Sequence, residues 1–261
     1  MDETYVDVDG ARLRCRFDGP LDAPVLVLSN SLGTDFTMWD PQMRALASAF
    51  RVLRYDTRGH GGSAVSPDPY SIERLGRDVI GLMDATGIDR GHFCGLSMGG
   101  MTGMWLGIHA PQRLDKLVLA NTAARIGPPE QWNARIEKVR VGGMAAIADA
   151  VLARWFTPAF HAAHPDAVAR MRAMLEHSPI EGYAASCAAV RDADQRESIA
   201  RITAATLVIS GAHDAATPPS DGRFLKQQIA DARYVELPAA HIANVEVAAQ
   251  FTDALLSFLI E

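Results

Sequence analysis

The chain has 261 residues, of which 48% are hydrophobic and 21% are charged, and its formal net charge is -6 at pH 7. This composition is that of a globular protein with a sizeable core, and the negative charge argues against nucleic acids and anionic membrane surfaces as partners. The longest apolar runs are far too short to span a bilayer.

A β-hairpin is the first predicted element. Two strand-like segments, residues 5–8 and 12–17, flank Asp9-Gly10, a dipeptide typical of a two-residue type I′ turn. In the second segment apolar residues alternate with arginines, which predicts one buried and one solvent-exposed face. We therefore expect antiparallel strands at one edge of a sheet.

Strands and helices alternate after the hairpin and again after residue 200. Interior strands are predicted at 24–29, 51–56, 92–96, 116–120, 206–210 and 234–237, and helices from about 71, at 98–109 and at about 244–259. This alternation implies a mostly parallel sheet that is covered by helices on both faces. The predicted fold class is therefore α/β.

The alternation is interrupted in the middle of the chain. Between about residues 121 and 200 there is no strand pattern, only helical stretches separated by proline and glycine. We expect residues 122–200 to form a helical cap, or lid, inserted over one end of the sheet. The core would then consist of residues 1–121 and 201–261.

The sequence Gly95-Leu-Ser-Met-Gly99 stands between a predicted strand and a predicted helix. In such a G-x-S-x-G turn the serine is held in a strained backbone conformation with its hydroxyl exposed, and the residues two positions away must be small. The free N–H groups of the following helix stabilise negative charge beside Ser97. Ser97 is therefore a candidate nucleophile, and an ordinary N-cap serine in a glycine-rich turn is the alternative.

Two further candidates follow later strands of the sheet. Asp214 lies in the turn after the strand at 206–210, and His241 lies in the loop between the strand at 234–237 and the last helix. In open α/β sheets functional groups gather at the carboxyl ends of the strands. For each residue alone the alternative is a structural role, as a helix N-cap or a loop histidine. Together, the chain order Ser97, Asp214, His241 favours a nucleophile–acid–base triad.

A serine that transfers acyl groups also needs N–H donors for the developing oxyanion. One donor is expected from Met98, directly after the nucleophile. The other is expected from the loop that follows the strand at 24–29. There the backbone N–H of Leu32 is the favoured donor, and that of Ser31 is the alternative.

These features together resemble the α/β-hydrolase superfamily, and the resemblance covers nearly the whole chain. It implies an eight-stranded, mostly parallel sheet with helices on both faces and an inserted helical cap. Closer similarity to the 3-oxoadipate enol-lactonases is found in Leu28-Ser-Asn-Ser-Leu-Gly-Thr-Asp35, Met38-Trp-Asp40, Tyr55-Asp-Thr-Arg-Gly-His-Gly61 and Gly95-Leu-Ser-Met-Gly-Gly100. Asn30-Ser31 stands where most members have His-Gly, and this departure is itself typical of the enol-lactonases.

The resemblance implies a reaction. A 3-oxoadipate enol-lactone would be opened to 3-oxoadipate through an acyl-enzyme on Ser97, a step of aromatic catabolism in the β-ketoadipate pathway. His241 would act as general base, and Asp214 would orient it and stabilise its protonated form. The resemblance implies no metal and no organic cofactor.

The lactone carries a carboxylate, so the cap should supply a cation or several hydrogen-bond donors. Trp132 and Arg135 are three residues apart on a predicted helix and can share one face. Arg154 and Trp155 form a second pair near the end of another predicted helix. We expect one of the two arginines to bind the carboxylate. In the alternative interpretation the tryptophans pack in the core of the cap and the arginines are solvated.

Other functions stay open at this point. A general carboxylesterase, or a perhydrolase of the cofactor-free haloperoxidase type, would keep the triad and act on another substrate. A small-molecule receptor on the same fold would bind its ligand without turnover, which an intact Ser-Asp-His set disfavours. A haloalkane dehalogenase is disfavoured, because its nucleophile is an aspartate where this chain has Ser97.

The compartment is inferred from the cysteines and the first residues. Cys15, Cys94 and Cys187 are scattered without metal-type spacing, which indicates buried free thiols in a reducing compartment. The start of the chain lacks the apolar segment of a signal peptide. We therefore expect a cytoplasmic protein, whose oligomeric state the sequence does not predict.

Overall fold

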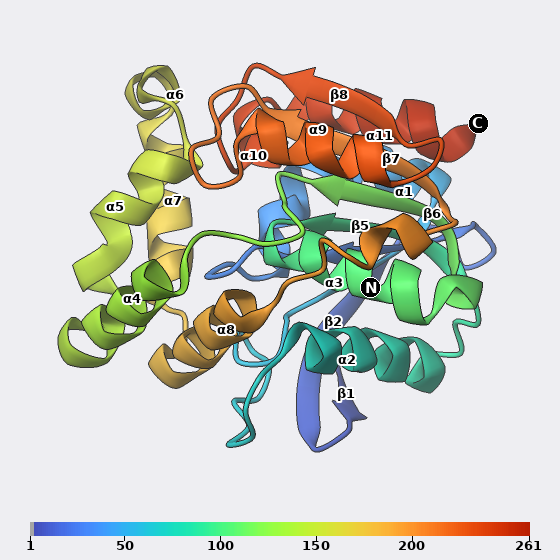
Figure 1. Ribbon diagram of the computed structural model, residues 1–261. Coiled ribbons are helices and arrows are strands. Elements are labelled where there is room, and N and C mark those ends of the chain that lie inside the picture. The colour runs from blue at the N-terminus through green and yellow to red at the C-terminus, as the bar shows by residue number, and fades with distance from the viewer. Residues whose placement is uncertain (1–2) are drawn as a thin grey trace.

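An eight-stranded sheet forms the centre of the computed structural model, which describes residues 3–261 (Figure 1). The strands are β1 (Thr4–Val8), β2 (Ala11–Asp18), β3 (Val25–Ser29), β4 (Arg51–Tyr55), β5 (Gly91–Leu96), β6 (Leu114–Ala120), β7 (Ala205–Gly211) and β8 (Arg233–Leu237). Their order across the sheet is β1-β2-β4-β3-β5-β6-β7-β8. The pairs β1–β2 and β2–β4 are antiparallel, and all other pairs are parallel. The predicted mostly parallel α/β sheet is confirmed.

The N-terminal hairpin has the predicted turn. Asp9 and Gly10 have φ angles of 41° and 77°, and a type I′ turn requires positive values at both central residues. On β2, Leu13 and Cys15 are fully buried, so this face of the strand packs on the core as the alternation predicts. Because β2 also pairs antiparallel with β4, the hairpin occupies one edge of the sheet.

Helices cover both faces of the sheet (Figure 1). On one face lie α2 (Ile72–Ala85), α3 (Met98–His109) and α9 (Pro219–Gln228), and on the other lie α1 (Asp40–Ala49) and α11 (Ala248–Ile260). α2 begins where the sequence predicts, because the side chain of Ser71 accepts a hydrogen bond from the N–H of Arg74. Among the helices of residues 3–261, none has the length and apolar character needed to cross a membrane.

The structure differs from the sequence pattern in three helices. The pattern does not predict α1 and α9, both of which carry a proline in their first turn. The predicted last helix is in fact two helices, α10 (Ala243–Glu246) and α11. Val247 between them has φ −126° and ψ 53°, outside the helical region, so the two helices are not continuous.

Five helices stand between β6 and β7: α4 (Pro129–Gly142), α5 (Ala145–Trp155), α6 (Pro158–Ala163), α7 (Pro165–Glu176) and α8 (Ile180–Asp192). No strand occurs in residues 121–204, all of which the structure describes. The five helices gather at one side of the sheet, on the left in Figure 1. They fall within the predicted cap, residues 122–200, whose limits as a separate unit stay a prediction.

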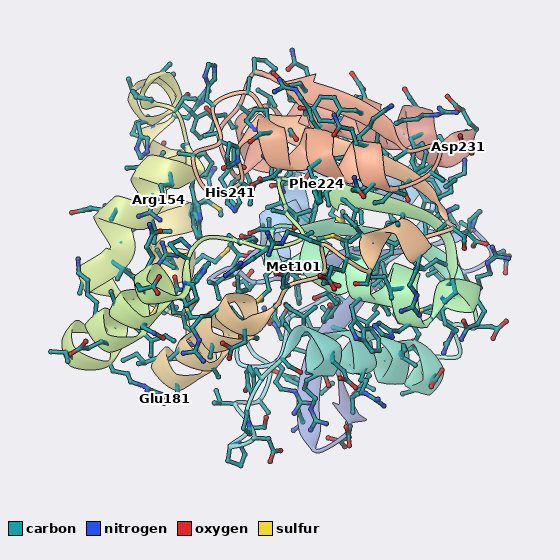
Figure 2. All side chains as sticks on the ribbon, viewed as in Figure 1. Met101, Arg154, Glu181, Phe224, Asp231 and His241 are labelled. Atoms are coloured by element: carbon teal, nitrogen blue, oxygen red, sulfur yellow. The ribbon has the colours of Figure 1, made fainter. Side chains whose placement is uncertain are left out.

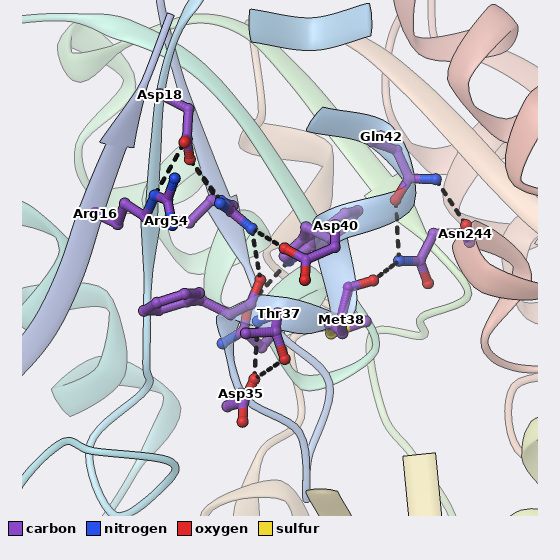
Figure 3. A network of polar contacts seen from close by, with 12 residues as sticks. Arg16, Asp18, Asp35, Thr37, Met38, Asp40, Gln42, Arg54 and Asn244 are labelled. Atoms are coloured by element: carbon purple, nitrogen blue, oxygen red, sulfur yellow. Dashed lines mark hydrogen bonds and ion pairs between the residues drawn. The ribbon is translucent and has the colours of Figure 1, made fainter. Parts of the chain in front are cut away.

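A polar network fixes the segment 35–42, which follows β3, against the sheet (Figure 3). Arg54 on β4 is buried and donates two hydrogen bonds to Asp18 on β2, at 2.9 and 2.7 Å. It also donates to Asp40 at 2.6 Å. Since Asp40 is the first residue of α1, the buried guanidinium joins this helix to two strands.

Candidate active site

Ser97 stands at a strained turn between β5 and α3. Its φ and ψ angles are 58° and −114°, a conformation that L residues rarely adopt. A Cβ added at Gly95 would lie 2.1 Å from the carbonyl oxygen of Gly99. One added at Gly99 would lie 2.3 Å from the carbonyl oxygen of Ser29. The turn therefore requires glycine at both positions, as the G-x-S-x-G pattern predicts.

The side chain of Ser97 is not used as a helix cap. Although Ser97 directly precedes α3, its side chain makes no N-cap hydrogen bond to the helix. Its backbone N–H donates to the carbonyl of Ala120 at 2.9 Å, which ties the turn to the end of β6. Ser97 and His241 line the same cavity. The N-cap alternative for Ser97 is thus removed, and its hydroxyl is available for chemistry.

His241 and Asp214 are hydrogen-bonded to each other. The distance between His241 Nδ1 and Asp214 Oδ2 is 2.8 Å, and both side chains are buried. Burial opposes ionisation of Asp214, but the imidazole of His241 and hydrogen bonds from Thr217 and Asn121 outweigh it, so the pKa of Asp214 lies below its ordinary value. An ionised Asp214 accepts the proton on Nδ1 and leaves Nε2 of the imidazole as the acceptor.

Asn121 and Thr217 support Asp214, although neither is among the predicted site residues. The N–H groups of Ala216 and Thr217 donate to Asp214 Oδ1 at 2.8 and 3.0 Å. Thr217 Oγ1 and Asn121 Nδ2 donate to Oδ2 at 2.8 and 3.1 Å. The Asp-x-x-Thr spacing is a recognisable signal for local side-chain capping. Asn121 gives no such signal, because it reaches Asp214 from the end of the neighbouring strand β6.

Next to Ser97 in the site, the backbone N–H groups of Leu32 and Met98 have no acceptor among residues 3–261. The adjoining N–H groups are engaged: Ser31 with the sulfur of Met38 at 3.4 Å, Gly33 with His60 Nε2 at 3.0 Å and Gly99 with the Asn30 carbonyl at 3.1 Å. A free N–H pair is what an oxyanion site requires. This pattern supports Leu32 rather than the alternative, Ser31, as the second donor.

Asn30 anchors the loop that carries Leu32. Asn30 is fully buried, and its Nδ2 donates to the carbonyl of Tyr55 at 2.8 Å. Its Oδ1 accepts a hydrogen bond from Trp39 Nε1 at 2.9 Å. The residue that departs from the His-Gly of most superfamily members therefore fixes the loop against β4 and the segment 35–42.

His60 also supports this loop, through a hydrogen bond to the backbone of Gly33. Its Nε2 accepts the Gly33 N–H, and its Nδ1 lies 3.4 Å from the carbonyl of Arg58. Burial lowers the pKa of His60 to about 4. The imidazole is therefore neutral in the folded protein at pH 7, with Nε2 as acceptor.

The protein is expected to lose stability as the pH falls from 6.5 to 4, in part because of His60. The unfolded chain binds a proton at His60 near pH 6.5, whereas the folded chain does so only near pH 4. The stability that the neutral His60 contributes is fully present above pH 6.5. About 3 kcal/mol of it is lost when the pH has fallen to 4. Urea unfolding at pH 7 and pH 4 of the wild type and of His60→Gln, which keeps an acceptor but does not titrate, measures it. An equal loss in both proteins would contradict the assignment.

All four predicted cap residues line the cavity beside Ser97. Trp132 and Arg135 come from α4, and Arg154 and Trp155 come from α5. The cavity volume is about 110 Å³, enough for a small molecule. Trp155 is buried, as the alternative interpretation expects of a residue in the cap core, and it forms part of the cavity wall as well.

The two arginines bring positive charge to the cavity without an acidic neighbour. The guanidinium of Arg135 lies over the ring of Trp132, 5.0 Å from its centroid. Within the described residues, the cavity lining contains no aspartate or glutamate. Burial and the positive charge of Arg135 lower the pKa of Arg154. A bound anion would relieve this repulsion, so the cavity is suited to an anionic ligand.

Comparison with known proteins agrees with this geometry. Residues 24–247 match the family model of the alpha/beta hydrolase fold. 3-Oxoadipate enol-lactonase 2 of Acinetobacter baylyi is 44% identical over 91% of this chain and 89% of its own length. Enol-lactonase 1 of that organism is 40% identical over 96% of this chain and 94% of its own. The crystal structure of the enol-lactonase from Burkholderia xenovorans LB400 superimposes on this one with a TM-score of 0.98. The two chains are 52% identical in sequence, and the match covers 99% of this chain and 100% of the other. The chain is therefore a hydrolase that belongs to the alpha/beta hydrolase fold family.

Proposed function

We propose that the protein opens 3-oxoadipate enol-lactone to 3-oxoadipate. The proposal rests on one observation: Ser97 and His241 line a small cavity together with two arginines and no acidic side chain among the described residues. A small lactone that bears one carboxylate matches both the nucleophile and the charge of this cavity. The relatives named enol-lactonases support the same substrate, because their similarity extends over the cap as well as the core.

In the first half of the reaction Ser97 becomes acylated. Its Oγ attacks the lactone carbonyl while His241 Nε2 removes the hydroxyl proton. The oxyanion that forms accepts hydrogen bonds from the backbone N–H groups of Leu32 and Met98. When this intermediate collapses, the ring C–O bond breaks, and the enol oxygen leaves with the proton held by His241. The enol then tautomerises to the ketone.

In the second half water releases the product. His241, neutral again, removes a proton from a water molecule that attacks the ester carbonyl of the acyl-enzyme. The same two N–H groups stabilise the second oxyanion. The bond to Ser97 Oγ breaks, the oxygen takes the proton back from His241, and 3-oxoadipate leaves with a new carboxylate. Asp214 stabilises the imidazolium in both halves.

The preference for the charged lactone is expected to depend on the arginines of the cap. The wild type should have a higher kcat/KM on the enol lactone than on p-nitrophenyl acetate, which has no carboxylate. Replacing Arg135 or Arg154 with alanine should lower kcat/KM on the lactone about 10- to 100-fold, because a charge-assisted hydrogen bond is lost. The value on p-nitrophenyl acetate should stay within about threefold.

Arg140→Ala is a matched control, since Arg140 also lies on α4 but pairs with Glu181 outside the cavity. Unchanged kinetics of both Arg135→Ala and Arg154→Ala on the lactone would eliminate the arginines as carboxylate ligands. A wild type that prefers p-nitrophenyl acetate would instead indicate a general carboxylesterase. The similarity of this chain to the structure of a thermophilic esterase from Thermogutta terrifontis, at 28% identity and a TM-score of 0.92, supports this alternative.

A further inference from the structure

One carboxylate joins the cap to the loop that carries His241. Glu246 lies at the end of α10, and its Oε2 accepts the N–H of Ala240 at 2.7 Å. Its Oε1 accepts the N–H of Thr157 at 3.1 Å and also the Thr157 hydroxyl. One oxygen therefore holds the residue before His241, and the other holds the residue that precedes α6.

Glu246 reaches these two segments from a fixed base. In the polar network of Figure 3, Asn244 Nδ2 donates to the carbonyl of Met38 at 2.8 Å. Gln42 Nε2 donates to the carbonyl of Asn244 at 2.7 Å, and both side chains are fully buried. α10 is thereby held to the core beside α1, so Glu246 extends toward the cap from a helix that is anchored on the core.

The loop of His241 also touches the cap directly. The N–H of His241 lies 3.4 Å from the carbonyl of Arg154, and the N–H of Ile242 donates to the carbonyl of Trp155 at 3.0 Å. Figure 2 shows Arg154 and His241 close together at the junction of α5 and this loop. The end of α5, the helix that carries Arg154 and Trp155 of the cavity wall, is therefore packed against the backbone of the histidine.

These contacts do not serve ordinary helix capping. Thr157 already caps α6, because its side chain accepts a hydrogen bond from the N–H of Phe160. Glu246 accepts hydrogen bonds from the N–H and the hydroxyl of Thr157, and the hydroxyl oxygen can still accept the N–H of Phe160, so the cap is intact. The carbonyl of Ala240 is in turn held by Asn121 Nδ2 at 3.2 Å. Glu246 thus completes the support of the peptide that leads into His241.

We propose that Glu246 is a positioning residue for the reaction, which holds the His241 loop and the Thr157 end of the cap at a fixed spacing. The inference rests on the assignment of His241 as the base in the proposed function. Proton transfer from Ser97 depends on the placement of the imidazole, and a displacement of about 1 Å can lower the rate about 100-fold. Loss of the carboxylate should therefore lower kcat more than it raises KM.

The test compares Glu246→Ala, Glu246→Gln and the wild type. Three readouts are needed: kcat and KM on the enol lactone, the rate at which a fluorophosphonate labels Ser97, and the melting temperature. We expect Glu246→Ala to lower kcat and the labelling rate together, by about 100-fold, with KM within about threefold. Gln retains an acceptor for the Ala240 N–H, and its amide can donate to the Thr157 hydroxyl. The kcat and the labelling rate of Glu246→Gln should therefore be about tenfold higher than those of Glu246→Ala.

Glu181→Ala is the matched control, because Glu181 also joins two segments, α8 and α4, but lies away from His241. It should leave kcat and labelling unchanged. Wild-type kcat and labelling in Glu246→Ala, or in Glu246→Gln where the alanine variant does not fold, would overturn the inference even if the melting temperature fell. A His241→Ala variant that is labelled as fast as the wild type would instead reject the assignment of His241 as base. The two failures are thereby distinguished.

Discussion

Replacing Ser97 with alanine is expected to lower kcat by about 10⁶-fold, the scale of effect that removal of a triad serine has in other hydrolases. We expect this loss because, among the described residues that line the cavity, Ser97 alone carries a hydroxyl that could form the acyl-enzyme. Alanine keeps the Cβ, so it imposes no greater strain than serine at a φ of 58°. The variant should fold normally, and the N–H groups of Leu32 and Met98, the proposed oxyanion donors, should stay in place.

Intact-protein mass spectrometry after fluorophosphonate treatment checks this result. The wild type should gain the mass of one adduct, and Ser97→Ala should gain none. Ser48→Ala is the control, since Ser48 is a serine on α1 whose hydroxyl bonds only to the carbonyl of Ala45. An adduct that persists in Ser97→Ala would show that the nucleophile is another residue and would remove the basis of the proposed function.

Replacing Asp214 with asparagine should lower kcat by about 10⁴-fold, because the imidazole is left in the wrong tautomer. Each oxygen of Asp214 accepts hydrogen bonds, from Ala216 and Thr217 on one side and from Thr217, Asn121 and His241 on the other. An asparagine must turn its NH₂ group toward donors on one of these sides. If the NH₂ group faces His241 Nδ1, that nitrogen must act as acceptor, and Nε2 carries the proton and cannot accept one from Ser97.

Steady-state kinetics of Asp214→Asn, with circular dichroism to establish folding, measures the effect. Asp253→Asn on α11 is the control for loss of one negative charge elsewhere, and its kcat should equal that of the wild type. A folded Asp214→Asn variant that kept kcat within tenfold of the wild type would assign the orienting role to another group. The residual rate should exceed that of Ser97→Ala, because the nucleophile is still present.

The parts of the site that the sequence predicts are those that the chain carries locally. Ser97 follows from two glycines two positions away, and Asp214 and His241 follow from their places after apolar strands. The interior strands are visible in a single sequence as short apolar runs, because a parallel strand that helices cover on both faces buries nearly every side chain. The hairpin turn at Asp9-Gly10 is predicted for the same reason, since its conformation depends on two residues only.

The parts that the sequence does not predict depend on contacts between distant segments. Glu246 and Thr157 are separated by 89 positions, and nothing near either residue indicates that they meet. Asn121 is visible only as a polar residue at a strand end, although it contacts Asp214. The cap arginines could be placed on helices, but whether their side chains reach the cavity depends on how α4 and α5 pack. Tertiary packing, which has no local signature, decides each of these.

The connection of the cap to the sheet bears on how this chain can change over evolution. β6 and β7 are direct neighbours in the sheet, and the chain leaves one and returns to the other after the five helices. The N–H of Asn121 donates to the carbonyl of Ile209 at 2.8 Å, so the two strands are hydrogen-bonded up to the residue at which the chain leaves the sheet. A segment of different length or shape could be exchanged there without altering the register of any strand. New substrates can thus be acquired by replacing one module, while the reaction is inherited unchanged, provided that the new module offers Glu246 a donor in the place of Thr157.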